Sequence, residues 1–137
     1  MNEPLAYLAD LEELAKSNDL QWPEVLARST ALGNSPADLL DAMSTDIALK
    51  YIRKEISFVH ADRVMNALWE LACSGDLLAS NDRTIPDTTQ RVFLAFDEGE
   101  YIHQGDGEDI DPVAKYTDPL IQEFVESLRT SRCRDDA

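Results

Sequence analysis

The sequence predicts a single α+β domain over residues 1–137 that is mainly α. Three observations predict it: helix-spaced apolar residues with end signals before residue 75, a continuous apolar run at Arg91–Phe96, and helix-spaced residues again at 118–131. They predict about five short N-terminal helices, a small antiparallel β-hairpin or three-stranded sheet at about 77–103, and a C-terminal helix. At 137 residues and 44% hydrophobic side chains, the chain can bury a core.

The first two predicted helices cover residues 4–17 and 22–32. Leucines three residues apart place an apolar stripe along 4–17, and Asn18 ends that helix. Pro23 is tolerated near the start of the second helix, because the first turn needs no backbone donor there, and Gly33 supplies a C-terminal stop. Helices this short depend on packing against one another.

Three further helices are expected between Gly33 and Gly75. Ser35 can accept a hydrogen bond from the first turn of a helix that begins at Pro36. Thr45 is expected to cap the next helix, which runs to about Ile56. Residues 61–74 carry apolar side chains at helical spacing on one face and end at a Ser-Gly pair.

The pattern then changes. Residues 75–89 are rich in turn-forming residues and are expected to loop over the surface. Arg91–Phe96 is short, continuous and rich in β-branched and aromatic residues, which predicts a strand buried on both faces. A turn at 97–100 would lead it back into Tyr101–His103 as a hairpin, and Leu77–Leu78 would supply the third strand of a sheet.

The last predicted helix covers residues 118–131. An acidic loop at 105–112 precedes it, and residues 132–137 are expected to form a frayed tail. Its apolar side chains are spaced to dock on the core, and they are Leu120, Ile121, Phe124, Val125 and Leu128.

Charge is the property in which this chain departs most from the average. Twenty-seven Asp and Glu oppose 12 Lys and Arg, so the formal net charge is −15. That charge repels nucleic acids and anionic membranes, which proteins hold chiefly through Lys and Arg, and it attracts positive partners. We therefore expect a basic protein partner, no direct binding to nucleic acid or membrane, and a chain that is a monomer or weak dimer.

The cysteines and the start of the chain indicate a cytoplasmic protein. Cys73 falls in an apolar helical run and is expected to be buried, whereas Cys133 falls in a polar tail and is expected to be exposed. They form no CxxC motif or disulfide framework, which fits a reducing compartment. Residues 1–4 contain neither the basic nor the apolar part of a leader, and no apolar run approaches 18 residues.

The most distinctive segment is 97–111, which holds seven acids. No Lys or Arg occurs between Arg91 and Lys115, so nothing nearby in the sequence neutralises them. Such a segment suits a binding face for a basic partner, with aromatic side chains as anchors. The predicted partner-binding residues are Asp97, Glu98, Glu100, Tyr101, His103, Asp106, Glu108, Asp109 and Asp111.

Three other meanings of the acidic segment stay open: a plain solvated loop, a divalent-ion site and a small carboxylate-based hydrolase that uses His103. The EF-hand template fails after Asp106, because Ile110, Asp111 and Thr117 replace the residues it requires. The sequence also lacks GxSxG, GxxxxGK and GxGxxG motifs, and its two histidines have no metal-binding spacing. We therefore expect no cofactor, no metal site and no catalytic residues, in a protein that is not an enzyme.

Two stretches, Ala95–His103 (AFDEGEYIH) and Tyr116–Ile121 (YTDPLI), resemble bacterial toxin-immunity proteins, the small acidic cytosolic domains that shield a cell from nuclease toxins. The resemblance covers less than a third of the chain. It implies a one-to-one complex in which acids occupy the toxin's basic nucleic-acid groove or a neighbouring site. The order of helices and hairpin also resembles a winged helix, for which the charges in 61–74, Arg63 against two acids, favour protein contacts over DNA.

Overall fold

The computed structural model describes residues 8–135, and the side chains of residues 8–130. Residues 4–7 of the first predicted helix, residues 136–137 of the predicted tail and the Cys133 side chain lie outside this part. The elements are α2 (Ala9–Lys16), α3 (Trp22–Leu32), α4 (Pro36–Ile52), α5 (Phe58–Ala72), α6 (Gly75–Ser80), α7 (Asp87–Asp97), the π-helical turn η1 (Val113–Thr117) and α8 (Asp118–Asp135). Within residues 8–135 no strand is present, so the predicted α+β class is wrong and the described fold is all-helical.

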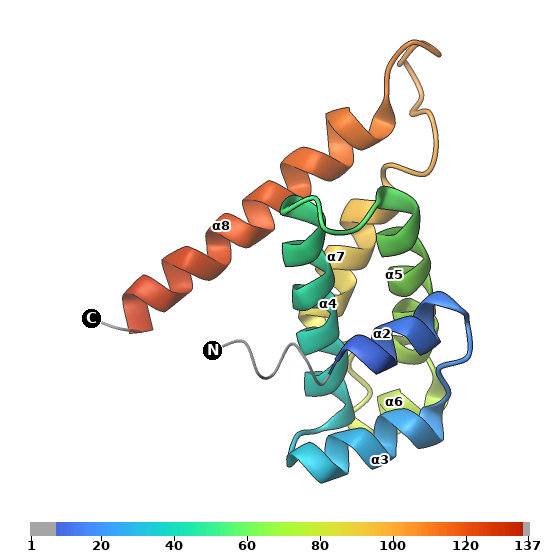
Figure 1. Cartoon of the computed structure of the whole chain (residues 1–137), viewed down its shortest axis with the longest axis vertical. Helices are drawn as coiled ribbons and strands as arrows, with labels where there is room; N and C mark the ends of the chain where they lie inside the picture. The colour runs from blue at the N-terminus through green and yellow to red at the C-terminus, as the bar shows by residue number, and fades with distance from the viewer. Residues whose placement is uncertain (1–7, 136–137) are drawn as a thin grey trace.

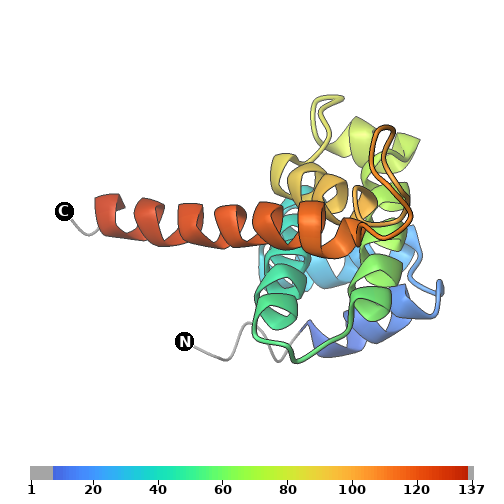
Figure 2. The same cartoon turned by 90° about the horizontal axis from the view of Figure 1, so that it is seen from above.

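Three helices, α4, α5 and α7, contact one another and form the centre of the molecule (Figure 1). Helix α2 packs across α5, α3 packs on α4, and α8 crosses α4 and α7 and extends well beyond them (Figure 2). Burial of each large aliphatic side chain stabilises such a core by about 1.5–3 kcal/mol. Its fully buried members include Leu40, Met43, Ile47, Val64, Met65, Leu68, Val92, Phe96 and Ile121.

Local end signals set several helix boundaries. The Ser35 hydroxyl accepts a hydrogen bond from the backbone N–H of Asp38 at 3.1 Å, which confirms the predicted start of α4. Gly33 ends α3 in the left-handed region, at φ 75°, as its position predicted. Ser57 caps α5 in the same way as Ser35 caps α4, through the backbone N–H of His60 at 3.1 Å, so α5 starts earlier than predicted.

The predicted helix break at Thr45 is wrong, because α4 continues from Pro36 to Ile52. No glycine or proline interrupts this stretch, and the polar side chains near Thr45 fit inside the helix. The Ser44 hydroxyl, which is buried, donates to the carbonyl of Leu40 one turn earlier at 2.8 Å.

The apolar run Arg91–Phe96, predicted as a strand buried on both faces, is part of helix α7. Thr89, Val92 and Phe96 are buried at successive spacings of three and four residues, whereas Leu94 is 46% exposed. This alternation is that of an amphipathic helix and not of a strand. The run therefore has one buried face, and its other face reaches the surface.

The other two predicted strands are also wrong. Leu77 and Leu78 lie in helix α6, whose start is capped when the Ser74 hydroxyl accepts from the N–H of Leu77 at 3.3 Å. Part of the loop predicted at 75–89 is thus helical. Tyr101–His103 belongs to the irregular segment between α7 and η1.

The predicted C-terminal helix is confirmed as α8, which begins at Asp118 and continues past residue 131 to Asp135. Ile121, Phe124 and Val125 are buried as predicted, but Leu120 is 39% exposed. No helix in residues 8–135 offers a stretch that is both long and apolar enough to cross a membrane.

Cys73 is exposed, contrary to the predicted burial. It is the residue directly after α5, where the chain turns toward α6, and so it lies off the buried face of the helix.

Candidate functional site

The loop that follows α7 is fixed to the helical body at its base. Gly99 is buried, and a Cβ atom there would collide with the hydroxyl of Thr117 and press on Phe58 and Val113. That hydroxyl is itself buried and donates to the carbonyl of Ala95 at 2.7 Å. A glycine is therefore needed for the end of α7 to meet the end of η1, and this contact sets where the acidic segment leaves the body.

Aromatic rings from the loop and η1 form a stack. The ring of His103 lies between Tyr101 and Tyr116, with centroid distances of 4.4 and 3.8 Å. The Nε2 atom of His103 is 2.7 Å from the carbonyl oxygen of Glu98 and 3.0 Å from its carboxylate. Because both neighbours only accept hydrogen bonds, Nε2 carries the hydrogen. The stack thus ties the loop back to the end of α7 and leaves Tyr101 49% exposed.

Asp106 is neutralised within the fold. Its carboxylate accepts hydrogen bonds from the Lys115 ammonium at 2.6 Å and from the Tyr116 hydroxyl at 2.7 Å. These bonds, that of Lys115 first, lower the pKa of Asp106. Asp106 thus has an internal role, which is to hold the loop on η1, and its role in partner binding stays a prediction.

Asp97 and Glu100 meet a residue that the sequence did not single out, Asp62 on α5. The side-chain amide of Asn66 donates to carboxylate oxygens of both Asp62 and Glu100, at 3.4 and 3.2 Å. Burial, the hydrogen bond to Glu100 and the charges of Glu100 and Asp97 raise the pKa of Asp62 to about 7. Burial and then the charges of Glu100 and Glu98 likewise raise the pKa of Asp97.

These three carboxyl groups have no positive partner in the described part of the chain. The ion pairs between residues 8 and 130 involve Asp10, Glu12, Asp46, Glu55, Glu98 and Asp106, and none includes Asp62, Asp97 or Glu100. Among the described residues, the cluster is therefore a concentration of negative charge without a compensating cation.

The remaining acids of the segment are placed differently. Glu108 and Asp109 are exposed. They belong to the long connection between α7 and η1, which projects from the helices at the top of Figure 1. The carboxylate of Asp111 accepts from the backbone N–H of Val113 at 3.0 Å, which stabilises the start of η1. Of the predicted residues, Glu108 and Asp109 lie apart from the cluster around Glu100.

We call the connected surface of acids and stacked rings the acidic–aromatic face. Each member is joined to the next by one of the contacts or charge interactions described above. The face comprises Asp62, Asp97, Glu98, Glu100, Tyr101, His103, Asp106 and Tyr116.

An apolar groove adjoins this face between α7 and α8. It has a volume of about 310 Å³, and the two most exposed leucines of these helices, Leu94 and Leu120, line it. Glu98 and Tyr116 belong to both the groove and the acidic–aromatic face, so the two surfaces are continuous. Arg91 and Glu123 supply the rest of the polar rim. The sequence did not indicate the groove, because Leu94 was assigned to a buried strand.

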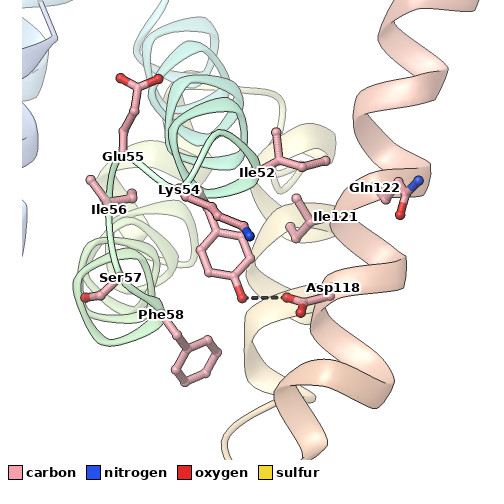
Figure 3. Close-up of a pocket in the computed structure, with 10 residues that line it drawn as sticks. Ile52, Lys54, Glu55, Ile56, Ser57, Phe58, Asp118, Ile121 and Gln122 are labelled. Atoms are coloured by element: carbon pink, nitrogen blue, oxygen red, sulfur yellow. Dashed lines mark hydrogen bonds between the residues drawn. The ribbon is translucent and has the colours of Figure 1, made fainter.

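A second cavity, of about 580 Å³, lies between the α4–α5 connection and the start of α8 (Figure 3). The Tyr51 hydroxyl donates to the Asp118 carboxylate there at 2.5 Å, and burial, followed by that bond, raises the pKa of Tyr51. Ile52, Phe58 and Ile121 give it an apolar wall. The Tyr51–Asp118 bond links α4 to the start of α8 and so supports η1, which precedes it.

The described residues contain no recognisable metal-binding group, and known proteins give no matching site. In residues 8–130, no three or more His, Cys, Asp or Glu side chains are grouped so that they could hold a metal ion. Searches with the chain find no matching protein-family model, no matching curated protein and no matching solved structure.

Proposed function

We propose that this chain is a non-enzymatic binding protein that holds a basic protein partner on its acidic–aromatic face. The observation that carries the proposal is the uncompensated cluster of Asp62, Asp97 and Glu100 beside the half-exposed ring of Tyr101. Like charges held together raise the free energy of the isolated protein, and a Lys or Arg side chain from a partner lowers it.

The neighbouring groove supplies the apolar contact area that the charged cluster does not provide. Interfaces combine a desolvated apolar centre with a polar rim, and a few aromatic or long side chains carry most of the binding energy. Leu94 and Leu120 form an apolar contact area for the partner, and Tyr101 offers an aromatic anchor within the same continuous surface. The net charge of −15 speeds encounter with a basic partner.

More specifically, we propose an immunity protein that neutralises a nuclease-type bacterial toxin in the cytoplasm. The two stretches that carry the resemblance, Ala95–His103 and Tyr116–Ile121, meet in space: Tyr116 stacks on His103, and Thr117 bonds to Ala95. Together they supply most of the acidic–aromatic face. In such a complex these acids replace the phosphates of nucleic acid against the toxin's basic groove.

Affinity capture tests the proposal. The tagged chain is incubated with a lysate of the source organism at low and at high salt, and the retained protein is identified and purified. We expect a basic protein that is released by salt, cleaves nucleic acid on its own, and stops doing so with one equivalent of the chain. A retained protein that is not basic, or a nuclease that stays active with excess chain, contradicts the proposal.

The hydrolase alternative gains support from one observation, the pKa of Asp62 near 7, a value suited to a general acid or base. Under this alternative Asp62 and Glu100 are the reacting carboxyl pair. Asp62→Asn then abolishes a hydrolytic activity of the purified chain, whereas the binding proposal expects no such activity to exist.

A further inference from the structure

We propose that Glu12 on α2 and Asp46 on α4 share a single proton in the folded protein, and that this buried proton site holds α2 in place and releases it at alkaline pH. The site is separate from the acidic–aromatic face and independent of the function proposed for it. Its basis is a mismatch, among the described residues, between two buried carboxyl groups and the single cation, Lys50, that reaches them.

Both carboxyl groups lie inside the molecule. Glu12 is 4% exposed and Asp46 is 1% exposed, so little water reaches either carboxyl group. Lys50 approaches both: its ammonium nitrogen is 2.7 Å from Glu12 Oε1 and 3.0 Å from Asp46 Oδ2. Two ionised carboxylates and one ammonium would leave a net negative charge in the interior, which costs several kcal/mol.

Hydrogen-bond donors are also too few for the two carboxyl groups. Glu12 Oε2 and both oxygens of Asp46 are buried and have no hydrogen-bond donor among the described residues. The Lys50 ammonium is near Asp46 but is not aligned to donate to it. A proton held between Glu12 and Asp46 supplies the missing donor and removes the excess charge in one step.

The other titratable groups beside Glu12 do not neutralise the two carboxyl groups. The cavity of about 260 Å³ beside Glu12 is also lined by Lys50, by His60 from α5, and by Glu13 and Glu55. Burial, followed by the nearby Lys16 charge, lowers the pKa of His60, so this ring is neutral at neutral pH and adds no second cation. Glu13 and Glu55 add only negative charge.

Lys50 stays charged and cannot relieve the pair by losing its proton. Burial alone would lower the pKa of Lys50, but the adjacent carboxyl groups of Glu12 and Asp46 raise it above the ordinary value. The Glu12–Asp46 carboxyl pair, and not Lys50, therefore loses a proton as the pH rises. Burial and the contact with Asp46 raise the pKa of Glu12 to about 8.

Loss of this proton acts on α2 first. The helix is 8 residues long, too short to persist without packing, and Glu12 sits on its buried side with Leu11 and Ala15. An ionised Glu12 beside Asp46 repels α4, and α2 then leaves the face of α5 that it covers.

The proton is tested with Glu12→Gln, which keeps a donor toward Asp46 and an acceptor for Lys50 but cannot ionise. Exposed Glu13→Gln on the same helix is the matched control. Urea unfolding of wild type and variants is measured from about pH 5 to about pH 10. The folded pKa of Glu12 is raised, so wild type loses stability as pH rises toward about 8, by about tenfold in the folding constant per pH unit.

The expected result is a ratio of folding constants, Glu12→Gln over wild type, that grows with pH and levels off above about pH 8. The Glu13→Gln ratio stays flat. A Glu12→Gln ratio independent of pH overturns the proposal, since it means that both carboxylates are ionised throughout. If Glu12→Gln does not fold, ¹³C-carboxyl resonances of wild type decide: one glutamate titrating near pH 8 supports the shared proton, and none overturns it.

Amide hydrogen exchange tests the release of α2. Protection factors in wild type at alkaline pH are expected to fall for Leu14 and Ala15 on α2 while those of Val64 and Leu68 on α5 persist. Glu12→Gln is expected to keep α2 protected. An equal loss of protection in both helices, or no loss of protection in α2, overturns the proposal that α2 is released.

Discussion

Asp62 on α5 and Glu100 in the loop after α7 are held together by the side chain of Asn66, which donates to a carboxylate oxygen of each at 3.4 and 3.2 Å. No Lys or Arg within the described residues forms an ion pair with either acid. A structural role alone would favour a basic residue at this contact, so the pair is the strongest sign that the surface serves a partner.

Asp62→Asn is expected to stabilise the isolated protein at pH 8 and to leave its stability unchanged at pH 4. The folded pKa of Asp62, about 7, lies above the ordinary value of 3.8, so the folded state binds the proton more tightly than the unfolded state. This group therefore costs the wild-type protein stability as pH rises from about 4 to about 7, and the variant lacks this contribution. Water screens this partly exposed group, so we expect a gain of about 1 kcal/mol.

Urea unfolding at both pH values measures the effect. Asp19→Asn, which removes an exposed acid without a bonded partner in the described structure, is the control and is expected to change stability by less than about 0.5 kcal/mol at either pH. A gain for Asp62→Asn that is the same at pH 4 and pH 8 would show that charge repulsion is not its cause.

Gly99→Ala is expected to destabilise the fold by about 2–3 kcal/mol. The added methyl group collides with the Thr117 hydroxyl, which cannot turn away without leaving the buried carbonyl of Ala95 unpaired. Thermal or urea unfolding gives the value. Gly75→Ala is the matched control, since nothing lies within 4 Å of its added Cβ atom, and it is expected to be neutral or slightly stabilising. Equal effects of the two substitutions would contradict the tight contact at Gly99.

Val92→Ala and Leu94→Ala distinguish helix from strand at the run that the sequence misassigned. Val92 is fully buried and its truncation is expected to cost about 2 kcal/mol, whereas Leu94 is 46% exposed and its truncation less than about 1 kcal/mol. A strand buried on both faces requires similar losses at both positions. The free energy of unfolding of the two variants, measured side by side, decides between the structures.

Helix ends marked by local chemistry could be predicted. Ser35 and Gly33 act within a few residues of their own positions, and both predictions are confirmed. Arg91–Phe96 could not be assigned in this way, because six apolar-rich residues fit a buried strand as well as one face of a helix. Part of what stabilises the helix is distant in the sequence: the Asp41 carboxylate accepts from the backbone N–H and the hydroxyl of Thr89, both at 2.8 Å, and so caps α7 from 48 residues away.

Several acidic residues of the candidate site could be predicted from the sequence, but their spatial arrangement could not. Asp97, Glu98, Glu100, Tyr101 and His103 do gather at the end of α7. Asp62 joins them only because α5 packs on α7, and a chain expected to form a hairpin there gives no hint of that contact. Asp106 pairs with Lys115, the first basic residue after the acidic segment, once η1 folds back on the loop.

The affinity of the basic partner for two variants of equal formal charge tests the account most directly. Asp62→Asn, Asp97→Asn and Glu100→Gln remove the central cluster, and Asp19→Asn, Glu24→Gln and Asp82→Asn remove three exposed acids elsewhere. Calorimetric titration at physiological salt is expected to show binding at least about tenfold weaker for the first variant and within about threefold of wild type for the second. Equal affinities for the two variants would show that net charge alone attracts the partner and would contradict the acidic–aromatic face.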